Sequence, residues 1–587
     1  MRFAIALILC CATLHAGYQH QFFEEDFGVL AKYRWYEVHT LEQAKALPAE
    51  AKAVATWGDP AVLEYLSGLP GIEALRVSVD DETGKWLRQF KALRVLDTCL
   101  DDESTPWIAG LSKLETLVST DTTIEVSDDV FSELSGLSRL HSLVFGGGFA
   151  CEEQTLTPAK VRTIASLPAL RRLDLTYNVF EGDAASELKA AKNLEELLLY
   201  SSFGLKSLHT AIAAMPGLKR LVLGLSEDEA HVLSDSIESA KALESLTVVG
   251  STADYTGIKC CLPVGLPATL KHLRLHGDST SDVTPEQWAR VVACKSLESL
   301  EIYVGCEIEA AMYEKLSGLP HLTKLAAYGD EGILRVIPKL KTLQDLTVTG
   351  SYGVGDRAWL EVSQSKSIKR LFLRDFSYVG GEVFASFANL LQLEVLKVHS
   401  TWNVLVGLEK FAGNSTLREL ELTGLENFND GDLAAIKSLS SLRRLALQFD
   451  PGEGSVDTTA LCNALAGVSS LVELRLSGIH LQAKDLTALS GLLNLVDVYL
   501  EPGSDAGVGF FRSLATLSSL KRVKLDCGEE PPVATSLKFL NGMKQVTCVL
   551  IIAKTWGEEE DRIRAEWTLN PLYLSLDNRR NEPWIDD

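Results

Sequence analysis

A repeat of three apolar residues constrains this chain more than any other feature of its sequence. Each copy has apolar residues at a first position a, at a+3 and at a+5, as in Leu194, Leu197 and Leu199. Twenty copies, with a mean period of about 24.8 residues, begin at 72, 93, 114, 140, 170, 194, 218, 243, 270, 297, 322, 343, 368, 393, 417, 442, 471, 495, 520 and 543. Leu, Ile, Val, Met or Phe fills 56 of the 60 positions, the exceptions being Thr98, Ser119, Ala327 and Cys548. Such a register predicts one stacked repeat protein, because no single copy can bury its leucines alone.

The spacing within each copy predicts a short strand followed by a helical return. Residues a+3 and a+5 lie on one face of an extended segment, whereas a+2, a+4 and a+6 lie on the other. Upstream of each triplet the apolar residues recur every third position, as in Leu433, Ile436 and Leu439, which suits a short helix or 3₁₀ turn. A weaker copy with Val54 at its strand is predicted to precede the first full one.

Here the chain resembles the leucine-rich-repeat superfamily, and residues 430–447 are similar to its bacterial or plant-like units with a helical back. The resemblance covers about residues 47–552 and implies an α/β solenoid of about 20–21 repeats. Such a solenoid is a curved horseshoe with a parallel sheet on its concave face and short helices on its convex face. The chain departs from the family at a+8, where an Asn usually ties the turn and only Asn178 fits. Asp or Ser stands there in other repeats and accepts similar turn hydrogen bonds, so the departure leaves the fold class unchanged.

The segments outside the repeats are predicted to be a signal peptide and two caps. Residues 1–17 contain one Arg, an apolar run from Phe3 to Leu14, and Ala16, which is the layout of a secretory signal. We therefore expect a secreted or extracytoplasmic protein; if the segment is a buried strand or helix instead, a cytoplasmic one. Residues 18–46 and 553–587 are predicted to cap the terminal repeats. No later apolar run reaches about 18 residues, so no transmembrane segment is expected.

The net charge and the cysteine content restrict the kinds of ligand and metal that the chain is expected to bind. The chain carries 56 basic and 79 acidic residues, a formal charge of −23, which would repel nucleic acid and anionic membranes at long range. No nucleic-acid partner is therefore expected. Nine cysteines follow residue 17 without a CxxC pair, so zinc is weakly supported. Cys260 or Cys261 paired with Cys294 or Cys306, and reduced cysteines in the core, both stay open.

Catalytic and cofactor motifs are not found in the sequence. There is no G-x-x-x-x-G-K-[ST], H-E-x-x-H, EF-hand or G-x-S-x-G pattern. His272 and His276 occupy a+2 and a+6 of one strand, about 13 Å apart at roughly 3.3 Å per residue, so they cannot share a metal directly. We expect no catalytic residue, no cofactor and no metal site.

The best candidate for a binding surface is the row of outward strand positions in the copies that begin between 270 and 393. Basic and aromatic residues gather there, with only Glu301 and Asp345 as acidic counterparts. Arg together with Tyr or Phe is typical of interface hot spots. The predicted partner-binding residues are His272, Arg274, His276, Tyr303, Lys324, Tyr328, Arg370, Phe372, Arg374, Lys397, His399 and Trp402.

Three hypotheses for function follow. The first is a non-catalytic binding protein that presents the concave surface to a protein ligand or a glycan. The second is a structural or surface-adhesion component in which the solenoid acts as a spacer. The third is an enzyme with an unfamiliar site on the inner face, which a cluster of perturbed carboxylates or histidines would support.

Overall fold

The computed structural model describes most of the repeat region. The described residues are 30, 32–119, 126–146, 154–200, 202–225, 227–250, 265–276, 283–303, 310–350, 354–376, 381–400, 407–425, 428–450, 456–503, 507–528, 531–554, 562–563 and 574–577. The chain separates into two compact units, Met1–Ile308 and Glu309–Asp587, called the N-terminal and C-terminal units below. The predicted signal peptide, Trp402, Cys260, Cys261 and Cys306 lie outside the described residues.

In the N-terminal unit, the apolar triplets form a parallel sheet in which each strand pairs with the next copy. Its strands are β1 (Trp35–Glu37), β2 (Ala53–Ala55), β3 (Ala74–Arg76), β4 (Val95–Asp97), β5 (Thr116–Ser119), β6 (Ser142–Phe145), β8 (Arg172–Asp174), β10 (Glu196–Leu199), β11 (Arg220–Leu225), β12 (Ser245–Gly250), β13 (His272–His276) and β14 (Ser299–Tyr303). A separate parallel pair is formed by β7 (Gln154–Leu156) and β9 (Asn178–Phe180).

The C-terminal unit continues the same pattern. Its strands are β15 (Lys324–Tyr328), β16 (Asp345–Thr349), β17 (Arg370–Phe376), β18 (Val395–Ser400), β19 (Glu419–Leu425), β20 (Arg444–Phe449), β21 (Glu473–Ser477), β22 (Asp497–Leu500), β23 (Arg522–Asp526), β24 (Cys548–Ile552) and β25 (Leu574–Asp577). Equivalent repeat positions pair across strands, as in Asp345 with Arg370 and Glu419 with Arg444. The predicted parallel sheet and its register are thereby confirmed.

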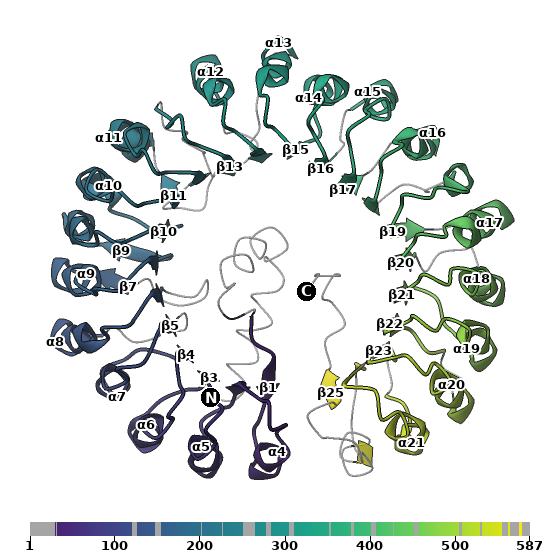
Figure 1. Ribbon diagram of the computed structural model, residues 1–587, viewed down its shortest axis with the longest axis horizontal. Coiled ribbons are helices and arrows are strands. Elements are labelled where there is room, and N and C mark those ends of the chain that lie inside the picture. Colours follow the sequence, from purple (N-terminus) through teal and green to yellow (C-terminus); the bar gives the residue numbers. More distant parts are fainter. Residues whose placement is uncertain are drawn as a thin grey trace. The chain divides into compact units, whose positions relative to one another are not determined.

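Short helices connect the strands in both units. The N-terminal unit has α4 (Leu41–Lys45), α5 (Pro60–Ser67), α6 (Asp81–Leu87), α7 (Thr105–Ala109), α8 (Asp128–Phe131), η1 (Ser132–Gly136), α9 (Pro158–Ala165), η2 (Ala184–Ala190), η3 (Leu205–Ser207), α10 (Leu208–Ile212), α11 (Glu227–Glu238) and α12 (Pro285–Ala293). The C-terminal unit has α13 (Ala310–Tyr313), η4 (Glu314–Gly318), α14 (Glu331–Val336), η5 (Ile337–Lys339), α15 (Asp356–Val362), α16 (Gly381–Ser386), η6 (Phe387–Asn389), η7 (Leu408–Phe411), α17 (Asp430–Ser438), α18 (Thr458–Leu465), α19 (Ala483–Leu489), α20 (Val508–Leu514), η8 (Ala534–Ser536) and α21 (Lys538–Asn541). Within each unit the strands lie on the inner side of an arc and the helices on its outer side (Figure 1).

Local chemistry explains where helices begin and why the triplets are buried. The Asp59 side chain accepts hydrogen bonds from the Ala61 and Val62 amides at the start of α5, and such a cap is worth about 1 kcal/mol. Triplet residues such as Leu194 and Leu197 are fully buried between sheet and helices. The polar exception Ser119 is also buried, and its hydroxyl accepts a hydrogen bond from the Leu100 amide.

The one Asn at a+8 does what the resemblance predicts. Asn178 is fully buried, and its Nδ2 donates to the carbonyls of Phe145 and Leu175, both at 2.8 Å. Where Asp replaces it, the carboxylate ties the turn as a helix cap: Asp80 accepts from the Glu82 and Thr83 amides. Asp80 therefore stabilises its turn through hydrogen bonds from the amides of the following helix, whereas Asn178 does so through hydrogen bonds to the carbonyls of neighbouring turns.

The predicted start of the last copy needs correction. The last copy does not begin at 543: Val523 pairs with Val549 and Leu525 with Ile551, so it begins at 546. Cys548 is consequently an exposed inner-face residue and not a core position. The sheet also extends into both predicted caps, because β1 pairs with β2 and β25 pairs with β24.

Candidate functional site on the inner face of the sheet

The inner face, meaning the sheet face turned away from the helices, carries the predicted binding residues in two separate groups. His272, Arg274, His276 and Tyr303 lie on β13 and β14 of the N-terminal unit. The remaining described members lie in the C-terminal unit: Lys324 and Tyr328 on β15, Arg370, Phe372 and Arg374 on β17, and Lys397 and His399 on β18. Each group is therefore a surface of its own unit.

In the N-terminal group, the charges are paired within the sheet. The Arg274 guanidinium donates to both carboxylate oxygens of Glu301, with Nε–Oε2 at 2.7 Å and Nη2–Oε1 at 3.2 Å. The His276 ring lies 4.7 Å from the Tyr303 ring. Burial, with a further contribution from the Arg274 charge, lowers the pKa of His276 to about 3. His276 is therefore a neutral ring near physiological pH and contributes no cationic charge to a binding surface.

In the C-terminal unit, Lys397 sits between two carboxylates. Its Nζ lies 3.0 Å from Glu419 and 3.2 Å from Glu421, while Nε2 of His399 lies 2.7 Å from Glu421. Burial raises the pKa of Glu421, but the hydrogen bond from His399 and the charge of Lys397 outweigh it and hold the pKa at about 2. Glu421 is thus ionised over the whole physiological range.

The pairing continues along the neighbouring strands. Arg444 lies 3.2 Å from Glu419 and 3.6 Å from Glu473, and Arg475 lies 2.7 Å from Glu473. We call the resulting set the ion-pair network; its members are Lys397, His399, Glu419, Glu421, Arg444, Glu473 and Arg475. On the other side of β18, Arg370 hydrogen-bonds Asp345, and this bond raises the pKa of the guanidinium.

An aromatic group borders the ion-pair network. The Phe372 ring meets the His399 ring edge-on with centroids 4.9 Å apart, and the Arg374 guanidinium lies 4.6 Å from the centre of the Phe372 ring. We call Phe372, Arg374 and His399 the aromatic corner. All three side chains are partly exposed on adjacent strands. An aromatic ring flanked by an arginine and a histidine offers apolar contact, a π face and hydrogen-bond donors in one place.

The structure changes the chemistry expected of this surface. The outward positions of the copies that begin between 270 and 393 hold five cations and only two acids, Glu301 and Asp345, but Lys397 also has Glu419 and Glu421 as partners. These two carboxylates stand at a+2 and a+4 of the copy beginning at 417, one repeat beyond the stretch considered. Including the outward positions of one more strand would therefore have identified both carboxylates from the sequence. In this region the surface therefore consists of cations and carboxylates that form ion pairs with one another, and it is nearly neutral, not cationic.

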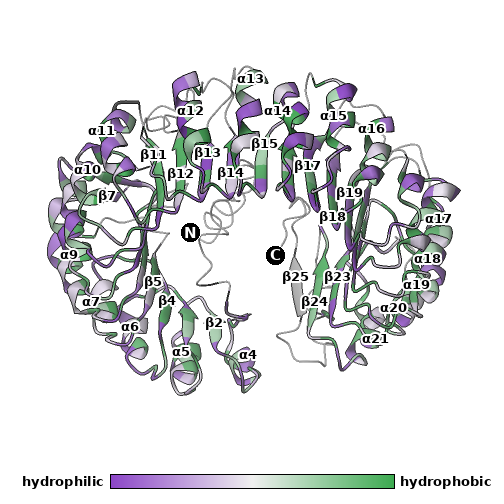
Figure 2. Cartoon of the chain, turned by 45° about the horizontal axis from the view of Figure 1, so that its top comes forward, coloured by the Kyte–Doolittle hydropathy of each residue, from purple (hydrophilic) through white to green (hydrophobic). Residues whose placement is uncertain are grey.

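A contrasting patch lies on the inner face of β2–β6. Leu30, with the partly buried Tyr33 and Trp35, packs against five small or β-branched residues, which we call the covered patch: Ala53, Ala74, Val95, Val118 and Val144. Each is at most 7% exposed. In Figure 2, β4 and β12 are largely in the hydrophobic colour, whereas β17 and β19 carry hydrophilic colour. Here Leu30, Tyr33 and Trp35 cover the inner face, whereas Phe372, Arg374 and His399 on β17 and β18 are partly exposed.

Other kinds of site are not seen in the described part of the chain. No group of three or more His, Cys, Asp or Glu side chains there is placed to hold a metal ion. Cys99, Cys294, Cys462, Cys527 and Cys548 are not part of a disulfide. Among the described helices, none combines the length and apolar character needed to cross a bilayer.

Comparison with known proteins gives structural neighbours only. No protein-family model matches the sequence, and no curated protein matches it. The TLR13 chain of a TLR13–ssRNA13 complex is 14% identical, with 93% of this chain and 94% of that chain covered and a TM-score of 0.43. A chain of the mouse RP105/MD-1 complex is also 14% identical, covering 86% and 92%, with a TM-score of 0.46. An internalin from Listeria monocytogenes is 19% identical, covering 70% and 86%, with a TM-score of 0.27.

The fold assignment rests on the chain's own geometry. Apolar triplets recur through both units, each forms a parallel strand in register with the next, and a short helix returns the chain behind the sheet. A buried Asn ties one turn as that architecture requires. This chain is a leucine-rich-repeat solenoid.

Proposed function

We propose that this chain is a non-catalytic binding protein, and that the inner face of the C-terminal unit contacts a protein partner. The observation that supports this most is the aromatic corner beside the ion-pair network. Phe372 and Arg374 provide the residue types that dominate interface energetics. The network holds the neighbouring side chains in fixed positions before a partner arrives, which reduces the entropy lost on binding.

The charge pattern favours a partner with mixed polar and apolar chemistry. Because Lys397, Arg370 and Arg444 are already paired, a highly acidic partner would gain little from them. A protein loop that places an apolar group on the partly exposed Phe372 ring, beside the Arg374 guanidinium, fits better. A glycan, whose sugar faces also stack on aromatic rings, is the alternative ligand.

Secretion belongs to the same proposal. The predicted signal peptide over residues 1–17 would deliver the chain outside the cytoplasm, where a binding surface meets extracellular ligands. The contact proposed here uses Arg370, Phe372, Arg374, Lys397 and His399, with Lys324 and Tyr328 at its border. The N-terminal group of His272, Arg274, His276 and Tyr303 is a second, smaller surface of the same kind.

The test is affinity capture from extracellular material with the full-length mature chain and two triple variants. The test variant carries Arg370→Ala, Phe372→Ala and Arg374→Ala. The matched control carries Tyr499→Ala, Arg522→Ala and Lys524→Ala, which removes a similar cation–aromatic arrangement on β22 and β23, where Lys524 lies 5.1 Å from the Tyr499 ring centre. We expect a retained protein that the test variant loses and the control keeps. Equal retention by all three chains would contradict the proposal, and retention of glycan alone would replace the protein partner.

A further inference from the structure

A second surface lies at the edge of the N-terminal sheet, outside the inner face. The residue just before each strand, at a+1, forms a row along this edge, which we call the edge row. The row starts in the weak first copy, in which Val54 occupies a+3. Its members are Lys52, Glu73, Arg94, Glu115, His141, Arg171, Glu195, Lys219, Glu244, Lys271 and Glu298. Backbone hydrogen bonds hold successive members side by side, as in Lys219 N to Glu195 O at 2.8 Å.

Charges alternate along the edge row. Lys52 pairs with Glu73 at 2.9 Å, Arg94 with Glu115 at 3.2 Å, and Lys271 with Glu244 at 3.1 Å. Opposite charges facing each other on neighbouring strands are mildly stabilising, and like charges are destabilising. Alternation is therefore the arrangement that a stacked edge favours by itself.

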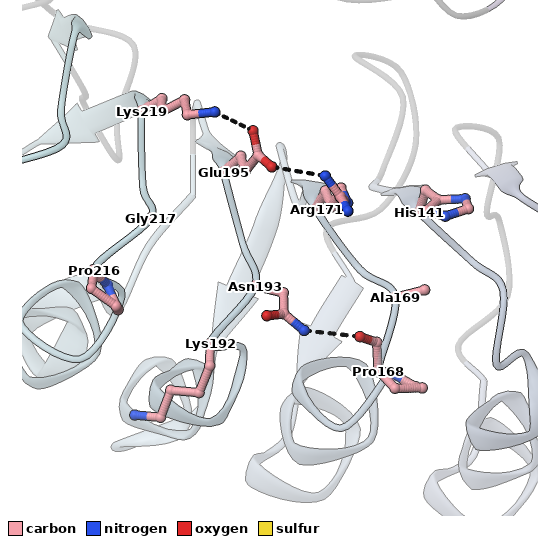
Figure 3. Close-up of a pocket in the computed structure, with 10 residues that line it drawn as sticks. All are labelled: His141, Pro168, Ala169, Arg171, Lys192, Asn193, Glu195, Pro216, Gly217 and Lys219. Carbon is pink, nitrogen blue, oxygen red and sulfur yellow. Dashed lines mark hydrogen bonds and ion pairs between the residues drawn. The ribbon is translucent and has the colours of Figure 1, made fainter.

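The alternation breaks at one place. His141 stands between Glu115 and Arg171, so Arg171 has a carboxylate neighbour on one side only. That carboxylate, Glu195, is shared: Arg171 Nη1 lies 3.1 Å from its Oε1, and Lys219 Nζ lies 2.7 Å from its Oε2 (Figure 3). Lys219 has a second carboxylate neighbour in the row, Glu244, so of these two cations only Arg171 lacks a carboxylate on its other side.

A surface depression of about 570 Å³ coincides with this break. Its lining includes Arg171, Glu195, Lys219, Lys192, His141, Pro168 and Pro216 (Figure 3). The Lys192 ammonium is held by a hydrogen bond to the Ala214 carbonyl at 3.3 Å. Among the residues that line the depression, three cations accompany one carboxylate, and Glu244 lies next to Lys219 in the row.

We propose that this depression binds a tetrahedral dianion, a sulfate or phosphate group carried by a small ligand. Three cations line the depression, and a dianion is attracted to them more strongly than a singly charged carboxylate. Arg171 donates to Glu195 through one nitrogen, and its planar guanidinium has further donors suited to two oxygens of one anion. The ammonium group of Lys219, which lies two repeats after Arg171, adds a compact positive charge. The bound anion restores the alternation that His141 interrupts.

The test measures binding of sodium sulfate and of inorganic phosphate to the full chain by calorimetry at low ionic strength. The test variant is Arg171→Gln with Lys219→Gln. The matched control is Lys52→Gln with Arg94→Gln, which removes the same residue types and two ion pairs from the same row. The side chains are similarly exposed: 64% and 56% for Arg171 and Lys219, against 58% and 61% for Arg94 and Lys52.

We expect saturable one-to-one binding that weakens about tenfold or more in the test variant and changes less than about twofold in the control. Because all four side chains are exposed, both variants should fold, which circular dichroism verifies. The absence of saturable binding to the wild-type chain, or equal losses in both variants, would overturn the site. Acetate bound as tightly as sulfate would overturn the assignment of a dianion.

Discussion

The covered patch on β2–β6 and the ion-pair network on β18–β21 are built from equivalent outward positions of different repeats, but their side chains differ in chemistry. In the first, residues such as Val95 and Val118 are buried under Leu30. In the second, Lys397 and Glu419 are partly exposed and Glu421 is buried, and the charges of all three are held in ion pairs. The backbone and register are the same in both. The two stretches therefore differ in their outward side chains, which are apolar and packed under Leu30 in the first and charged and paired in the second.

The largest expected difference between the two regions concerns a buried charge. Val118→Asp places a carboxylate in the covered patch, where Val118 is 2% exposed, and should lower the free energy of unfolding by about 3 kcal/mol or more. Thr347→Asp makes the same change at the equivalent position of β16, which is partly exposed, and should cost less than about 0.5 kcal/mol. Urea unfolding of both variants measures this, and equal losses would remove the distinction between the two faces.

Removal of the cover should have the next largest effect. Leu30→Ala deletes the buried side chain that packs on the covered patch and should cost about 2–3 kcal/mol. Hydrogen exchange should then rise in β2–β6 and stay unchanged in β18–β21. A uniform rise over both units would show that Leu30 acts on the whole chain and not on this patch.

A smaller effect is expected from the ion-pair network. Glu421→Gln should cost about 1–2 kcal/mol near neutral pH, because Lys397 and His399 lose the negative charge they share and an NH2 donor replaces one of the two acceptor oxygens. Folding lowers the pKa of Glu421 from its ordinary 4.5 to about 2, so its contribution is fully present above about pH 4.5 and is lost as the pH falls toward 2. The difference between wild type and variant should shrink over that window. A difference that is independent of pH would contradict the role given to the charge.

The smallest effect should come from an exposed member of the network. Arg444 is 62% exposed although it contacts Glu419 and Glu473. Arg444→Gln should therefore change the free energy of unfolding by less than about 0.5 kcal/mol. A cost near that of Glu421→Gln would mean that the network acts as one cooperative unit, and a double-mutant cycle would then measure the coupling.

The fold was largely predictable because its signal repeats. A triplet such as Leu218, Leu221 and Leu223 fixes strand, register and buried face at once. The last copy was misplaced by three residues because Met543 and Val546 match the first two triplet positions while Val546 truly begins the copy. Strands β1 and β25 escaped prediction because they are short and lie where the triplet pattern fades.

The binding surface was less predictable, for a physical reason. Which residues point outward follows from the period of two, but which charges compensate each other depends on contacts about 25 residues apart in the chain. Lys397 looked like part of a cationic stretch until Glu419 and Glu421 were placed beside it. Leu30 lies more than a hundred residues before Val144, and no periodicity connects them.

The central claim is that the inner face over β17–β19 is open to a partner whereas the face over β2–β6 is closed by the chain itself. Hydroxyl-radical footprinting of the free full-length chain tests it directly, with each residue's rate normalised to its rate in the unfolded chain. We predict strong labelling of Phe372 and His399 and strong protection of Val95, Val118 and Val144. Equal normalised rates in the two regions would contradict the claim.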